Sequence, residues 1–174
     1  KEAEEAIKRV EDLLRRNKEV AERIIREIRR LLREADETSK RMDEDLRRLL
    51  REAEDLVRRG TTEEVLEELK ERLKESHKEH KKKVDELIER LRKLLEDLER
   101  HIRKSDRDLD RLREEVKDVR ELDKVLERVK RESDRLLKEI EKVVREVEER
   151  LRRLNEHHEK VIREIEKKLE DDRR

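Results

Sequence analysis

The sequence predicts an all-α protein, a long antiparallel up-down-up three-helix bundle that forms a single domain over residues 1–174. Three observations predict it: apolar residues recur at every third or fourth position, 61% of the residues are charged, and breaks in the pattern occur at two places. A disordered chain can have a similar composition, but it has no reason to space its apolar residues regularly. The periodicity therefore favours helices.

The apolar positions follow an 18-residue repeat, as at Val10, Ile28 and Leu46. This repeat corresponds to five turns of an α-helix, so we expect nearly straight apolar stripes and nearly untwisted, coiled-coil-like packing. Two further triplets with this spacing are Leu73, Leu91 and Leu109, and Val129, Val147 and Ile165. A single isolated charged helix is the alternative, but such a helix needs no apolar stripe.

The first helix is expected over about 2–59 and the second over about 62–118. Between them, Gly60 suits the C′ position after a helix, and Thr61 with Glu64 fits a capping box that opens the next one. A short connection between two helices makes them antiparallel neighbours. The first break is therefore a helix-turn-helix.

The third helix is expected over about 122–173, although the second break contains neither Gly nor Pro. The evidence for this break is the phase of the apolar pattern. If the pattern of the second helix is continued beyond Val116, it is more than one residue out of step with the pattern that begins at Leu122. Asp118 with Glu121 also fits a capping box. We expect a monomer. The alternative is a self-associated or domain-swapped dimer; in the domain-swapped form this turn stays helical and the third helix is exchanged with another chain.

The composition excludes much chemistry. The 53 basic and 53 acidic residues give a formal net charge of zero, which argues against nucleic-acid or anionic-membrane partners. The sequence lacks Cys and aromatic residues, and Ser76 and His77 are adjacent on a helix and point about 100° apart. We therefore expect no enzyme activity, no cofactor and no required partner, and a soluble chain that is cytoplasmic when expressed.

The uncharged polar residues are the exceptions in this restricted alphabet, and most occupy positions that elsewhere hold apolar residues. Antiparallel pairing places them in two layers, each supplied by all three helices. The first layer consists of Asn17, Ser105 and Ser133, with His101 at its boundary. The second layer consists of Thr38, Ser39, Ser76, His77, His80, Asn155 and His158. His157 fits a surface position, since its place in the repeat is that of Glu139.

Buried polar groups are costly unless they bond to one another, so the layers predict hydrogen-bond networks that penalise misaligned helices. A metal site is a second hypothesis, because His77, His80 and His158 could supply three imidazoles to zinc. A pH switch is a third, because buried neutral imidazoles lose their stabilising effect as pH falls through about 6.5. A helix-recruiting module is a fourth.

The repeat, the restricted alphabet, the Gly60–Glu64 turn and the polar layers together resemble a de novo designed helical bundle with buried hydrogen-bond networks. The resemblance covers the whole chain. Natural bundles of the spectrin-repeat kind are similar in topology, but they usually carry core aromatics and abundant Gln, both of which this sequence lacks. The resemblance implies a hyperstable structural scaffold with no natural substrate.

Overall fold

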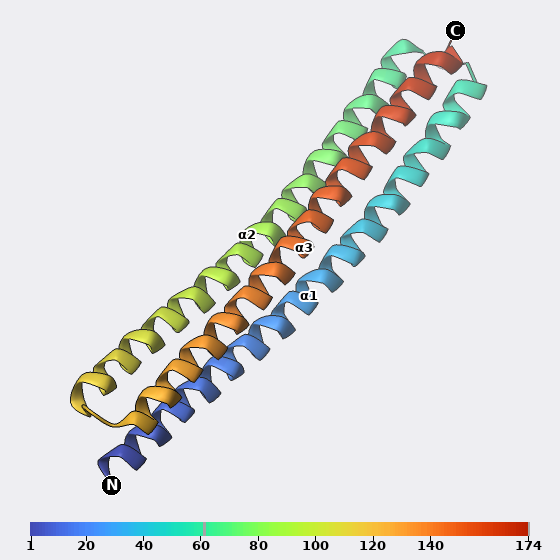
Figure 1. The fold of residues 1–174 in the computed structure, drawn as a ribbon. Coiled ribbons are helices and arrows are strands. Elements are labelled where there is room, and N and C mark those ends of the chain that lie inside the picture. The colour runs from blue at the N-terminus through green and yellow to red at the C-terminus, as the bar shows by residue number, and fades with distance from the viewer. Residues whose placement is uncertain (61, 174) are drawn as a thin grey trace. The chain divides into compact units, whose positions relative to one another are not determined.

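The computed structural model describes residues 1–60 and 62–173, and the side chains of all these except 172 and 173. It contains three helices, α1 (Glu2–Arg58), α2 (Glu63–Glu115) and α3 (Arg120–Arg173), and no strand among the described residues (Figure 1). The predicted all-α three-helix fold is confirmed. The largest difference from the predicted bounds is the end of α2, which stops at Glu115 instead of 118.

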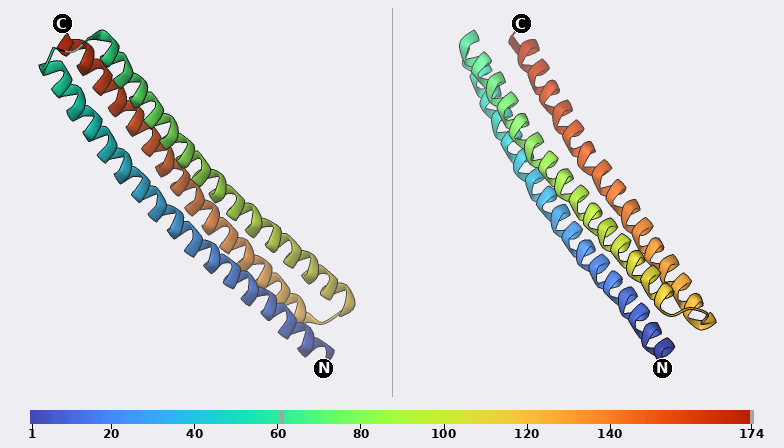
Figure 2. Two further views of the ribbon diagram at one scale, coloured as in Figure 1. Left: turned by 180° about the vertical axis from the view of Figure 1, so that it is seen from behind. Right: turned by 90° about the vertical axis from the view of Figure 1, so that its left-hand side faces the viewer.

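The helices form two compact units, each built from a stretch of α1, α2 and α3. Unit 1 comprises Lys1–Arg30 and Arg90–Glu146, and unit 2 comprises Leu31–Glu89 and Val147–Arg174. In unit 1, the first turns of α1 lie beside the connection from α2 to α3 in all views (Figures 1 and 2). Each unit has its own apolar core.

The core of unit 1 forms where the apolar stripes of the three helices meet. One cluster of buried residues in this core consists of Ala6, Val10, Leu14, Leu109, Leu112, Leu122, Leu126 and Val129. These residues are spaced by three, four or a multiple of such steps along each helix, which places them on one helical face. Burial of one face therefore accounts for helix formation in a sequence that is otherwise charged.

The core of unit 2 is built in the same way. Its buried members are Met42, Leu46, Leu49, Ala53, Leu66, Leu69, Leu73, Ile162, Ile165 and Leu169. The 18-residue repeat holds across both units, because Val10, Ile28 and Leu46 are all buried. The stripe positions that the sequence identified are thus core positions.

The first connection turns at Gly60, whose φ of 70° lies in the left-handed region that glycine adopts without a steric penalty. The carbonyl of Thr62 accepts the first helical hydrogen bond of α2, from the amide of Leu66 at 3.4 Å. The expected capping box of Thr61 and Glu64 depends on Thr61, which lies outside the described residues.

The second connection differs from its prediction. Asp118 has a φ of 63°, whereas an N-cap residue adopts an extended backbone, so the expected Asp118–Glu121 capping box is wrong. The amide of Asp123 instead donates to the carbonyl of Val119 at 3.1 Å, and α3 begins at Arg120. The chain thus reverses direction between the end of α2 at Glu115 and the start of α3 at Arg120, with Asp118 in the left-handed region.

The surface of each unit carries ion pairs between helices. In unit 1, Lys18 lies 3.9 Å from Glu132, and in unit 2, Arg150 lies 3.3 Å from Asp36. Such exposed pairs contribute little individually. No helix of the described residues has an apolar stretch long enough to cross a membrane.

Candidate functional site

The polar layer of unit 1 is a hydrogen-bonded triad with one residue from each helix. The Asn17 amide nitrogen Nδ2 donates to Ser105 Oγ at 3.1 Å and to Ser133 Oγ at 2.9 Å. Asn17 and Ser133 are fully buried, and Ser105 is 4% exposed. One amide group of α1 therefore joins α2 and α3.

The repeat explains why these three side chains point inward. The equivalent positions one repeat away on the same helices are held by the buried residues Ala35, Leu87 and Leu151. The sequence thus places polar groups on the apolar stripe itself. Asn17 Oδ1 is buried without a hydrogen-bond partner among the described residues, so the amide uses its donors and leaves its acceptor unpaired.

The polar layer of unit 2 centres on two buried histidines. His158 is fully buried and His80 is 4% exposed, and their rings meet edge to face with His158 Nδ1 against His80 Nε2. On the other side of the His158 ring, Nε2 lies 3.4 Å from Asp43 Oδ1 of α1, which is close enough for an ion pair. The row Asp43, His158, His80 therefore crosses from α1 through α3 to α2.

The row also favours one arrangement of protons. A neutral imidazole carries one N–H and one bare nitrogen. If His158 carries its hydrogen on Nε2, facing the Asp43 carboxylate, then its bare Nδ1 accepts from His80 Nε2–H. His80 Nδ1 is then a bare nitrogen, and it is buried with no partner among the described residues. Both N–H groups of the row consequently point toward acceptors.

Burial controls the ionisation of this layer. Removal from water, the largest cause, acts together with the neighbouring His158, His77 and Lys83 to lower the pKa of His80 to about 4. Burial also lowers the pKa of His158, although the Asp43 carboxylate acts in the opposite direction. Both imidazoles are therefore neutral at pH 7.

The remaining predicted members of the second layer lie around this row without one continuous network. Ser76 Oγ donates to the Met42 sulfur at 3.3 Å, and His77 Nε2 lies 3.4 Å from Glu159 Oε1. Five residues of the predicted layer are partly buried: Thr38, Ser39, Ser76, His77 and Asn155. The buried Oδ1 of Asn155 has no hydrogen-bond partner among the described residues.

The zinc hypothesis required His77, His80 and His158 to face a common point. Instead, His80 and His158 direct ring nitrogens at each other, and His77 faces Glu159. No group of three or more His, Asp or Glu side chains in the described part of the chain could hold a metal ion. The three imidazoles are thus not arranged as metal ligands.

Asp43 is the member of the site that the sequence reasoning missed. It follows the apolar position Met42 and looks like an ordinary surface acid in the repeat. The alignment of α1 with α3 could have identified it. The residue numbers of side chains that meet across these two helices differ by 116 for Asn17–Ser133 and by 115 for Asp43–His158. Counting back from His158 by 115 or 116 residues leads to Asp43 and Met42, and Asp43 is the acid of the two.

Burial also shifts the pKa values of His101 and Asp106 in unit 1. Burial, aided by Arg23 and Lys104, lowers the pKa of His101. Burial raises the pKa of Asp106, which Lys130 partly counteracts. His101 is half-buried, and among the described residues it makes no hydrogen bond to the Asn17 triad.

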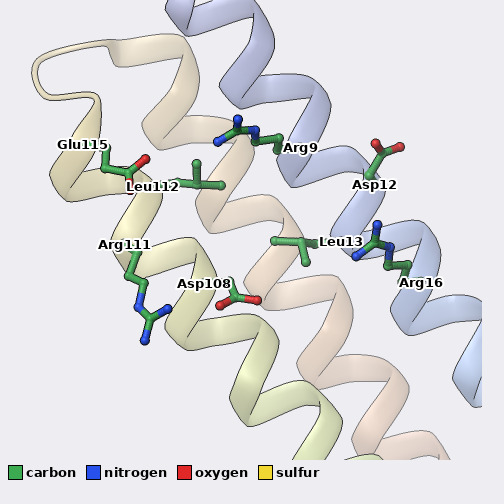
Figure 3. Close-up of a pocket in the computed structure, with 8 residues that line it drawn as sticks. All are labelled: Arg9, Asp12, Leu13, Arg16, Asp108, Arg111, Leu112 and Glu115. Atoms are coloured by element: carbon green, nitrogen blue, oxygen red, sulfur yellow. The ribbon is translucent and has the colours of Figure 1, made fainter.

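A surface groove runs between α1 and α2 in unit 1 (Figure 3). Leu13 and Leu112 project into it from opposite sides, while Arg9 extends across from α1 and Arg111 points away. A second groove, between α1 and α3 in unit 2, is lined by Asp43 and His157 and by apolar side chains including Val161. Both grooves mix apolar floors with charges of both signs, which defines no specific ligand.

The arrangement as a whole defines a three-helix bundle with two unlike polar layers. Its fold is similar to that of a solved structure described as a computationally designed three helix bundle, with a TM-score of 0.58. The two sequences are 20% identical, and the match covers 98% of this chain and 91% of that chain. No protein-family model and no curated protein matches the sequence.

Proposed function

We propose that this chain is a designed structural scaffold without natural biochemical activity, in which buried polar layers specify the register of the helices. The observation that carries the proposal is the Asn17 amide, which donates to one hydroxyl on each of the other two helices. A shift of one helix by a turn would place a polar group against aliphatic side chains, at a cost of about 1 to 3 kcal/mol for each unpaired group. The apolar stripe alone repeats along the helix and tolerates such shifts much better.

The experiment compares the protein with the triple variant Asn17→Leu, Ser105→Ala, Ser133→Ala. Replacing all partners by apolar groups is close to neutral for stability, so any change in register is separable from unfolding. Spin labels at the exposed positions Glu4 and Lys142, which lie far apart along the helix axes, report the α1–α3 alignment of unit 1. We expect one narrow distance distribution for the parent protein and additional distances, displaced by about one 5.4 Å turn, for the variant. A single unchanged distance in the variant would refute the proposal.

The His80–His158 contact supports a second candidate function, a pH-responsive bundle. The groups that face this pair are His77 and Lys83 from α2, His157 from α3 and Asp43 from α1. His77, Lys83 and His157 carry a positive charge when they are protonated. A second proton on the His80 ring would lie on Nδ1, which has no hydrogen-bond partner among the described residues. Protonation of the buried His80 ring in acid therefore creates a positive charge and an N–H group without an acceptor. Loss of helicity on acidification that disappears in His80→Leu, His158→Leu supports this function; equal acid sensitivity in that variant excludes it.

A further inference from the structure

The two connections between helices differ in backbone strain. Gly60 turns the first connection at a φ of 70°, and no heavy atom lies within 4 Å of the place where a Cβ would be. Asp118 turns the second connection at a φ of 63°, and it is the one non-glycine residue with positive φ in the described chain. A left-handed backbone is unfavourable for a residue with a side chain, although Asp tolerates it better than most. Strain of this kind is therefore concentrated at the α2–α3 connection.

The same connection is short, because only residues 116–119 separate the end of α2 from the start of α3, and a helical hydrogen bond lies on each side of its centre. The amide of Val116 donates to the carbonyl of Leu112 at 3.0 Å, and the amide of Asp123 donates to the carbonyl of Val119 at 3.1 Å. Lys117 and Asp118 lie between these two helical bonds. The sequence has no Pro, and its one Gly is at position 60, so no residue after that turn opposes a helix. A change of backbone conformation at these two residues would join α2 to α3.

A chain that straightened in this way would expose the apolar face of α3. In unit 1 this face consists of Leu122, Leu126 and Val129, all buried against α1 and α2. A second copy of the same chain offers the identical α1–α2 surface. Exchange of one element between identical chains preserves the native contacts, and a short strained hinge favours it.

We infer that two copies of this chain form a dimer by exchanging α3, with Lys117 and Asp118 as the hinge. In this dimer the Asn17 amide of one copy bonds to its own Ser105 and to Ser133 of the partner subunit. The exchange replaces the left-handed Asp118 by a helical residue in both copies, whereas association costs translational freedom. The dimer is therefore favoured at high protein concentration. This inference is independent of any role of the scaffold.

The first experiment unfolds the protein in denaturant, refolds it over a wide range of concentration, and measures mass by light scattering. We expect a monomer at low concentration and a fraction of twice that mass at high concentration. A monomer at every concentration would overturn the inference.

Cross-linking distinguishes exchange of α3 from ordinary association. The introduced cysteines would be the only thiols, because the sequence has no Cys. Asp110→Cys with Lys130→Cys places one thiol on α2 and one on α3, at a position where the native side chains form an ion pair. A short bis-maleimide should link two chains covalently in the exchanged dimer. The control pair, Glu52→Cys with Arg72→Cys, joins α1 and α2 and should link residues within one chain. Links within one chain for both pairs in the dimer fraction would contradict exchange.

Two substitutions at the hinge test the role of strain. Asp118→Gly removes the penalty for positive φ and also weakens a continuous helix, so the dissociation constant of the dimer should rise about 30-fold, equivalent to about 2 kcal/mol over two hinges. Asp118→Ala removes the same carboxylate but keeps the penalty and favours a helix, so the dissociation constant should fall. Equal constants for both variants would rule out Asp118 as the hinge.

Discussion

The polar layers of the two units both interrupt the apolar stripes of the helices, but they differ in chemistry. In unit 1, the Asn17 layer contains groups that do not ionise, and a single amide joins the three helices. In unit 2, two buried imidazoles lie in a row with a half-exposed carboxylate, and burial lowers the pKa values of both histidines. Both layers bring side chains of different helices together inside the protein, and we expect only the ionisable layer to make stability depend on pH.

The largest effect should be acid destabilisation through unit 2. The pKa of His80 falls from 6.5 to about 4 on folding, so between these values the unfolded chain binds more protons than the folded one. Stability is therefore unaffected above pH 6.5, decreases as pH falls toward 4, and changes no further through His80 below that. We expect a loss of about 2 to 3 kcal/mol between pH 7 and pH 4.5, measured by denaturant unfolding followed by circular dichroism.

Paired variants assign this loss to one unit. His80→Leu, His158→Leu should remove most of the pH dependence. The unit 1 variant Asn17→Leu, Ser105→Ala, Ser133→Ala should retain it. The same pH dependence in all three proteins would show that the histidine row is not its source.

The next effect concerns unit 1 and should not depend on pH. Asn17→Ala removes the shared donor and leaves the hydroxyls of Ser105 and Ser133 buried without it, so we expect a loss of about 1 to 3 kcal/mol. The loss should be equal at pH 7 and pH 5, because none of the three side chains ionises in this range. Denaturant unfolding at both pH values measures it, and a loss that differs between them would contradict the comparison.

A smaller effect is expected from Asp43→Asn in unit 2. The carboxylate raises the pKa of His158 against the effect of burial, so its removal should lower that pKa further. The variant should consequently lose more stability than the parent between pH 6.5 and pH 4.5, with little change at pH 7. Titration of the His158 ring by NMR measures the direction, and a raised pKa in the variant would contradict the role of Asp43.

The smallest effects should come from matched surface pairs. Glu132→Gln in unit 1 removes the ion pair with Lys18, and Asp36→Asn in unit 2 removes the ion pair with Arg150. We expect each to change stability by less than about 0.5 kcal/mol, and equally in the two units, because both pairs are exposed to solvent and screened by salt. Denaturant unfolding at low and high salt checks this expectation.

The sequence supports the prediction of the helices and of inward-pointing polar residues because both follow from helical periodicity. Asn17, His80 and His158 occupy stripe positions, and a residue on the stripe faces the core wherever the bundle forms. The same reasoning failed at Asp118, because turn geometry depends on how two out-of-phase stripes reach one core and not on local capping preferences. It also missed Asp43, whose role depends on the alignment of α1 with α3.

The sequence by itself thus determined three amphipathic helices, the two turns and the residues on the buried stripe, since these depend on neighbours within about one helical turn. The tertiary structure decided which polar atoms meet. It paired the Asn17 amide with two hydroxyls, and it turned His158 and His80 toward each other instead of toward a common metal. The physical reason is that hydrogen bonds and metal coordination depend on distances of a few tenths of an ångström, whereas periodicity fixes the face of a helix and not the position of an atom.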